Sequence, residues 1–208
     1  MIRKTSAFAL FLAILALSVE PAFAHHLMGG RTPSTFLEGV LSGLGHPIIG
    51  LDHFAAVVAV GCLAAAHRAG PGLAIAFVLA MIAGVGVHLH GTTVPIAEIL
   101  VALTVIGLGA IMLLGRQVSA GTAMTLFALV GLVHGYALGE SIYGAEPTPL
   151  YAYLFGLAVI QSAIALGAMS VARLLARRTA DVSATRLIGA GIAGIGLAVF
   201  MQQIIPGA

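Results

Sequence analysis

The chain has 208 residues, of which 60% are hydrophobic and only 8% are charged, and its mean hydropathy is +1.12. Soluble domains usually carry about 25% charged residues, so this composition excludes an ordinary soluble protein and predicts an integral membrane protein. The nine basic residues are scattered and no glycine-rich phosphate loop is present, which argues against nucleic acid and nucleotide as partners. A single cysteine excludes a disulfide framework.

The first 24 residues have the parts of a secretory signal peptide. Two basic residues precede an apolar stretch at residues 7–19 that is short for a membrane span, and Ala22-Phe23-Ala24 fits the small-x-small cleavage pattern. We therefore expect a cleaved signal peptide at residues 1–24 and one mature domain at residues 25–208. An uncleaved first helix is the alternative.

Six long apolar runs follow a short stretch at residues 34–45, which we interpret as an interfacial helix. Each run is close to the ~20 residues that cross ~30 Å of hydrocarbon. Lipid offers backbone groups no hydrogen-bond partners, so each run must be a helix. The six predicted spans are residues 47–66, 72–90, 95–114, 120–140, 150–172 and 187–206. The predicted fold class is all-α: a polytopic membrane protein with six transmembrane helices.

Loop charges orient these helices. With the mature N-terminus outside, the outer segments hold only Arg31, and every other arginine after the leader lies in an inner loop, as the positive-inside rule requires. The inner arginines are Arg68, Arg116, Arg173, Arg177, Arg178 and Arg186. Every histidine except His67 then falls on the outer side. We therefore predict a multi-pass protein of the bacterial inner membrane with a periplasmic mature N-terminus.

The strongest candidate metal site is the segment His46-Pro-Ile-Ile-Gly-Leu-Asp-His53. Pro47 suits the first position of a helix, and on such a helix His46 and His53 would lie two turns apart on one face, with Asp52 beside them. An aspartate costs about 3 kcal/mol at the centre of an apolar membrane helix and less near its ends, so Asp52 at the mouth of this run points to a functional role. Two imidazoles and a carboxylate suit a borderline divalent ion. The alternative is a helix cap with interfacial histidines.

Other metal-capable residues lie on the same outer side. His134 and Glu140 occur near the end of the fourth predicted helix; a core histidine and a solvated carboxylate are the alternative. His88 and His90 end the second helix, and both could meet one ion only if that helix frays, because residues two apart point about 200° apart. Glu98 lies in the first turn of the third helix, before unbroken apolar sequence, and is the better candidate ligand.

The His-Pro-x-x-Gly-x-Asp-His pattern at residues 46–53 resembles the signature of the HupE/UreJ family of nickel and cobalt permeases. The resemblance extends over most of the mature chain, with a leader, six helices and a second motif in the fourth helix. That second motif, His134 to Glu140, departs from the commoner form, which is similar to Phe-His-Gly-x-Ala-His-Gly-x-Glu. Val133 and Leu138 replace the phenylalanine and the second histidine, and the acid comes one place early. This variant resembles a subgroup associated with cobalt as readily as with nickel.

The resemblance implies metal ligation by His46, Asp52, His53 and His134, and less directly by Glu140. We predict a secondary permease, not an enzyme, whose substrate is Ni²⁺ or Co²⁺ and which needs no cofactor. An inside-negative potential supplies about 4.6 kcal/mol per 100 mV for a doubly charged ion. A homo-oligomer is left open. Two alternatives are a membrane-embedded metal-dependent hydrolase and a metal-binding accessory protein for urease or hydrogenase maturation that transports nothing.

Overall fold

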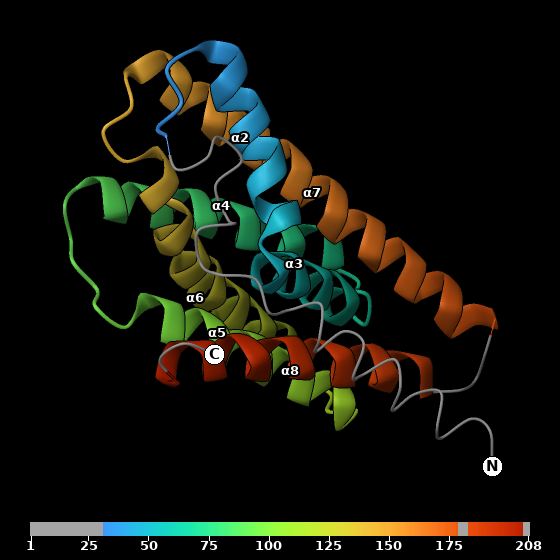
Figure 1. Cartoon of the computed structure of the whole chain (residues 1–208). Coiled ribbons are helices and arrows are strands. Elements are labelled where there is room, and N and C mark those ends of the chain that lie inside the picture. The colour runs from blue at the N-terminus through green and yellow to red at the C-terminus, as the bar shows by residue number, and fades with distance from the viewer. Residues whose placement is uncertain (1–30, 179–182, 206–208) are drawn as a thin grey trace.

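A computed structural model describes residues 31–178 and 183–205 (Figure 1). Over these residues the chain is all-helical and contains no strand. The helices are α2 (Phe36–Ile49), α3 (Leu51–Ala64), α4 (Gly70–Leu89), α5 (Ala97–Leu113), α6 (Ala120–Leu138), the 3-10 helix η2 (Glu140–Ile142), α7 (Pro147–Arg178) and α8 (Ser183–Ile204). The predicted signal peptide and the pair His25-His26 lie outside the described residues.

The helices have the lengths and apolar composition of a membrane protein. Within the described ranges, four stretches are long and apolar enough to cross a membrane: α4, α6 together with η2, α7 and α8. The bent pair of α2 and α3 makes a fifth if it is counted as one span, whereas α5 has 17 residues and is a shorter apolar helix. All six predicted apolar runs therefore fall on helices, and four or five of these helices have the size of a span.

The first predicted span differs from the expectation at its start. Pro47 does not begin a helix but lies inside the last turns of α2, and the chain bends by 78° between α2 and α3. Proline has no N–H to donate to the preceding turn, and Gly50 leaves the helix with φ −72° and ψ 99°. The prediction that His46 and His53 share one helical face is therefore wrong, because a bend separates them.

The start of α2 is set by a local hydrogen-bond motif. The Thr35 hydroxyl accepts from the Glu38 N–H, while the Glu38 carboxylate accepts from the backbone N–H groups of Ser34 and Thr35. This capping box satisfies donors that the first helical turn leaves unpaired. A helix is thus present in the predicted stretch at residues 34–45, but it begins at Phe36 and continues through the histidine and proline of the motif.

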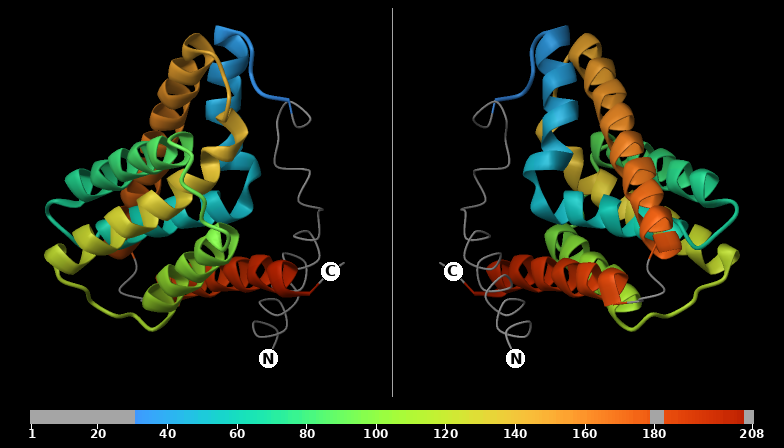
Figure 2. Two further views of the ribbon diagram at one scale, coloured as in Figure 1. Left: turned by 90° about the vertical axis from the view of Figure 1, so that its left-hand side faces the viewer. Right: turned by 90° about the vertical axis from the view of Figure 1, so that its right-hand side faces the viewer.

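Small residues let the helices pack closely in pairs. α2 lies beside α7, α4 beside α6, and α5 beside α8 (Figures 1 and 2). A Cβ added at Gly43, Gly135 or Gly109 would overlap backbone atoms of α7, α4 or α8, respectively. Close approach of this kind stabilises helix pairs in lipid, where apolar burial between helices supplies little driving force. Glycine at these three positions therefore permits the close contacts.

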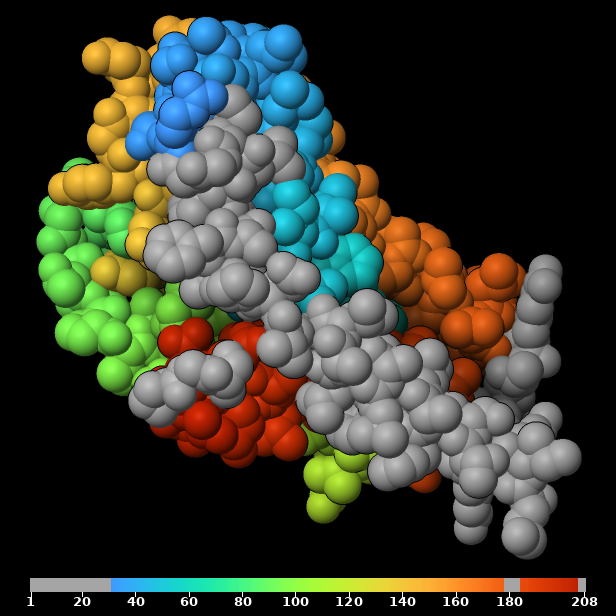
Figure 3. Space-filling view, in the orientation of Figure 1, coloured from blue at the N-terminus to red at the C-terminus, as the bar shows by residue number. Residues whose placement is uncertain are grey.

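The surface of the helices is apolar. In the space-filling view, α2 lies at the top, α7 runs down the right-hand side and α8 forms part of the lower edge (Figure 3). Large apolar side chains are exposed on these helices, including Leu37 on α2, Phe155 on α7, and Leu187 and Leu197 on α8. Water would hydrate such surfaces poorly, whereas lipid chains match them.

Candidate metal site

Two buried histidines from distant parts of the chain meet at the centre of the site. His53, in the first turn of α3, is 6% exposed, and His134, near the end of α6, is fully buried. Their Nδ1 atoms are 2.9 Å apart and their ring centroids 5.0 Å apart. The predicted first and second motifs are therefore joined through this pair.

Thr104 on α5 determines which nitrogen of His134 carries the proton. The Thr104 hydroxyl donates its only hydrogen to the Val101 carbonyl oxygen at 2.7 Å. Its oxygen, 2.9 Å from His134 Nε2, must therefore accept a hydrogen bond from the Nε2–H of that ring. In the neutral ring, Nδ1 then holds a lone pair that points at His53, and His53 Nδ1 donates to it.

The geometry of the pair suits a shared metal ion. Two imidazole nitrogens bound about 2.05 Å from one ion at a right angle would be about 2.9 Å apart. To bind one ion in this way, each ring would have to turn so that its Nδ1 lone pair pointed at the ion instead of at the other ring. The His53 proton would then shift to Nε2 of the same ring, which frees both Nδ1 lone pairs for the ion.

The bend at Gly50 brings the rest of the first motif to this pair. His46, on the last turns of α2, is 7% exposed, and its ring centroid lies 6.0 Å from that of His53. Asp52 is 6% exposed and lies in the first turn of α3, where the helix dipole favours a carboxylate. Its Oδ1 atom accepts a hydrogen bond from the His53 N–H at 2.8 Å. The bend, rather than one helical face, assembles the motif.

The two predicted glutamates lie beside the site. Glu98 is half-buried in the first turn of α5, as predicted, and it lies within electrostatic range of Asp52 and Glu140. Glu140 is exposed in η2, beyond the end of α6. The negative charges of Asp52 and Glu140 therefore act on Glu98.

His88 and His90 lie at the end of α4. The His88 ring packs between Tyr136 and Tyr143, with centroid distances of 4.7 and 5.7 Å, and its Nδ1 is buried without a hydrogen-bond partner among the described residues. His90 caps the C-terminus of α4 and is exposed. The structure therefore places these two side chains in different environments.

The predicted ligands surround the pair without forming a closed cage. Over residues 31–178 and 183–205, no group of three or more histidine, cysteine, aspartate or glutamate side chains is close enough together to hold an ion. The contacts found join His53 to His134 and to His46, with Asp52 bound to the backbone of His53. Binding of an ion by more than two of these residues would require side-chain movement.

Sequence reasoning missed three polar residues near this site. Thr104 contacts His134 directly, and Tyr136 clamps the loop between α4 and α5 by donating to the Thr92 carbonyl and accepting from the Val94 N–H. Gln161 on α7 is fully buried. The available signal was the same for Thr104 and Gln161: each is a hydrogen-bonding side chain inside an otherwise apolar run.

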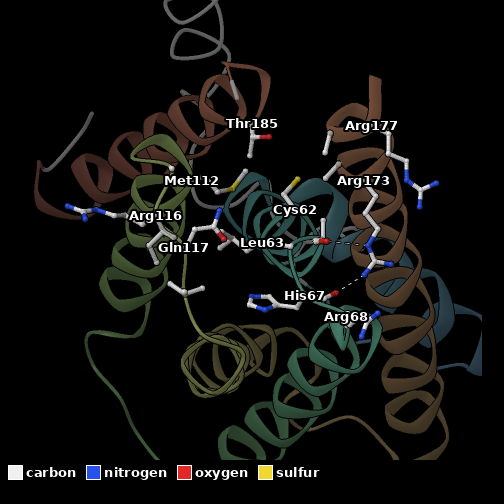
Figure 4. Close-up of a pocket in the computed structure, with 17 residues that line it drawn as sticks. Cys62, Leu63, His67, Arg68, Met112, Arg116, Gln117, Arg173, Arg177 and Thr185 are labelled. Atoms are coloured by element: carbon white, nitrogen blue, oxygen red, sulfur yellow. Dashed lines mark hydrogen bonds between the residues drawn. The ribbon is translucent and has the colours of Figure 1, made fainter. Parts of the chain in front are cut away.

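A cavity of about 910 Å³ lies at the other end of α3 (Figure 4). Cys62, His67 and Met112 line it together with four of the predicted inner arginines, Arg68, Arg116, Arg173 and Arg177. Arg173 donates to the carbonyl oxygens of Ala65 and His67, which holds the end of α3 against α7. Arginines from three predicted inner loops or helix ends therefore meet at one end of the molecule, opposite the histidine pair.

Comparison with known proteins agrees with the motif. The family described as HupE / UreJ protein matches residues 12–199. Protein HupE of Rhizobium leguminosarum bv. viciae is 34% identical over 139 residues, which cover 65% of this chain and 68% of that protein. No solved structure matches the chain. The chain therefore belongs to the HupE/UreJ family.

Proposed function

We propose that this protein is a secondary permease that takes up Ni²⁺ or Co²⁺ across the inner membrane. The observation that carries the proposal is the buried pair of His53 and His134, whose Nδ1 atoms lie 2.9 Å apart. Ionisable side chains at this depth in a membrane protein are costly and mark ion pathways by default. The chain also belongs to the HupE/UreJ family. The resemblance of its motif to that family's signature implies a nickel and cobalt permease, which supports the same function.

The proposed ligand set is His46, Asp52, His53 and His134, with Glu98 and Glu140 next to it and His88 and His90 further out. Nitrogen and oxygen donors without a thiolate suit Ni²⁺ and Co²⁺. Imidazole binds metal only in its neutral form, so uptake should weaken as the outer solution becomes acidic.

The proposed path runs from the histidine pair to the cavity at the far end of α3. Nine residues of helix separate His53 from Cys62, which corresponds to about 13 Å. In this proposal the arginine-lined end faces the cytoplasm, as the positive-inside rule requires. The mature N-terminus is then periplasmic, and the six helices cross the membrane with α2 and α3 acting as one bent span.

Transport can be tested in proteoliposomes that hold an inside-negative potential. Ni²⁺ and Co²⁺ are offered separately and together, and the Asp52→Asn variant is compared with Glu146→Gln, a matched change at an exposed carboxylate on the same side. Asn retains an oxygen that can accept from the His53 N–H but removes the charge that offsets a cation. We expect saturable uptake in the wild type and Glu146→Gln, and its loss in Asp52→Asn.

Two results would contradict the proposal. Normal uptake by Asp52→Asn would show that the motif carboxylate does not bind the ion. Tight binding in detergent without uptake by the wild type would indicate a metal-binding accessory protein instead.

A further inference from the structure

Gln161 is a buried amide that nothing in the helix bundle satisfies. Its side chain is fully buried in the middle of α7, and both Nε2 and Oε1 lack a hydrogen-bond partner among the described residues. Burying an amide without hydrogen bonds costs free energy, and in lipid water cannot repay that cost. A leucine would fill the same space at a lower cost, so the amide needs another explanation.

The packing of α7 places Gln161 opposite the bend between α2 and α3. A Cβ on Gly43 of α2 would lie 2.9 Å from the Leu157 nitrogen, and a Cβ on Gly61 of α3 would overlap the Ala165 carbonyl. Gln161 lies four residues from each of these contacts and therefore shares their face of α7. This face therefore packs against α2 before the bend at Gly50 and against α3 after it, and α7 runs beside both helices (Figure 1).

The ridge of α7 that contains Gln161 also leads to the inner cavity. Continuing from Gln161 in steps of four residues, it passes Ala165 and Met169, which are both buried, and reaches Arg173, which lines the cavity. The distance from Gln161 to Arg173 along the helix is about 18 Å. Each step of four residues turns this ridge by about 40°, so the ridge winds partly around α7 between Gln161, its buried polar side chain, and the cavity.

We propose that Gln161 contacts the permeating divalent ion after it leaves the histidine pair. The Oε1 atom can replace one water of a partly dehydrated cation, since Ni²⁺ accepts oxygen donors alongside nitrogen, and it binds them more weakly than imidazole. A neutral amide holds the ion less tightly than a carboxylate would, which favours passage over retention. This inference rests on the proposed transport function.

The test compares Gln161→Leu and Gln161→Glu with Gln203→Leu, which makes the same change at an exposed position on α8. Initial rates of Ni²⁺ uptake are measured in proteoliposomes over a range of concentrations, and thermal midpoints are measured in detergent. We expect the maximal rate of Gln161→Leu to fall by about tenfold or more, the scale seen when groups around a metal are removed. Its half-saturating concentration should stay unchanged, and its thermal midpoint should stay equal or rise.

Gln161→Glu keeps an oxygen donor and should transport faster than Gln161→Leu, and Gln203→Leu should behave like the wild type. Uptake by Gln161→Leu at the wild-type rate would overturn the inference. A lower rate accompanied by a lower thermal midpoint would also overturn it, because it would show that the amide acts structurally. Absence of uptake by the wild type would remove the proposed function itself, and the inference with it.

Discussion

Gly135 lies at the closest approach of α4 and α6, so Gly135→Ala tests both packing and the histidine pair. A Cβ at this position would overlap the Met81 carbonyl oxygen and lie 2.6 Å from the Met81 carbonyl carbon. Carbon atoms pack at about 3.5 Å or more, so the helices would have to separate by roughly 1 Å. Because His134 is adjacent on α6, the same shift would displace its Nδ1 relative to His53.

The magnitude follows from two opposing effects. Overpacking a tight contact costs about 1–3 kcal/mol, whereas alanine in a helix is favoured over glycine by about 1 kcal/mol. Gly107→Ala on α5 is the matched control, because a Cβ there meets nothing within 4 Å. The helix propensity cancels between the two variants, so Gly135→Ala should be less stable than Gly107→Ala by about 1–3 kcal/mol.

The assay is unfolding of both variants in detergent, followed by Ni²⁺ uptake by the folded fractions in proteoliposomes. We expect a lower unfolding midpoint and a lower uptake rate for Gly135→Ala, and a midpoint at or above that of the wild type for Gly107→Ala. Equal midpoints for the two alanine variants would refute the reasoning, because they would show that α4 and α6 separate without cost.

Two other predictions concern hydrogen bonds at the site. Thr104→Val should lower Ni²⁺ affinity by about 10–100-fold in calorimetric titrations, because it removes the hydroxyl that keeps His134 Nδ1 free of hydrogen. Thr104→Ser keeps the hydroxyl and should restore the affinity. Equal affinity in the two variants would contradict the tautomer assignment. Tyr136→Phe removes the hydroxyl that donates to Thr92 and accepts from Val94. It should destabilise this loop by about 1–3 kcal/mol, seen as faster hydrogen exchange of the Val94 amide; unchanged exchange would show that the clamp does not hold the loop.

Much of the architecture follows from the sequence because few backbone conformations satisfy their own hydrogen bonds in lipid. Each apolar run had to be helical, since unpaired backbone groups have no partner in hydrocarbon, and all six runs are on helices. The helical spacing of Gly131, Gly135 and Gly139 is typical of a close helix contact, and a Cβ at Gly135 would overlap the backbone of α4. The motif at residues 46–53 identified the family, which residues 12–199 match.

The tertiary structure alone decided how the site is assembled. Pro47 was compatible with the start of a helix and with its last turns, and the extended conformation of Gly50 together with packing against α7 selected the second. The contact between His53 and His134 joins residues 81 positions apart, and it depends on where helices cross, which side-chain fit determines. Thr104 and Gln161 became candidate functional residues only when their neighbours were known. The role of a polar side chain in an apolar run depends on whether the folded protein gives it a hydrogen-bond partner, which the sequence does not show.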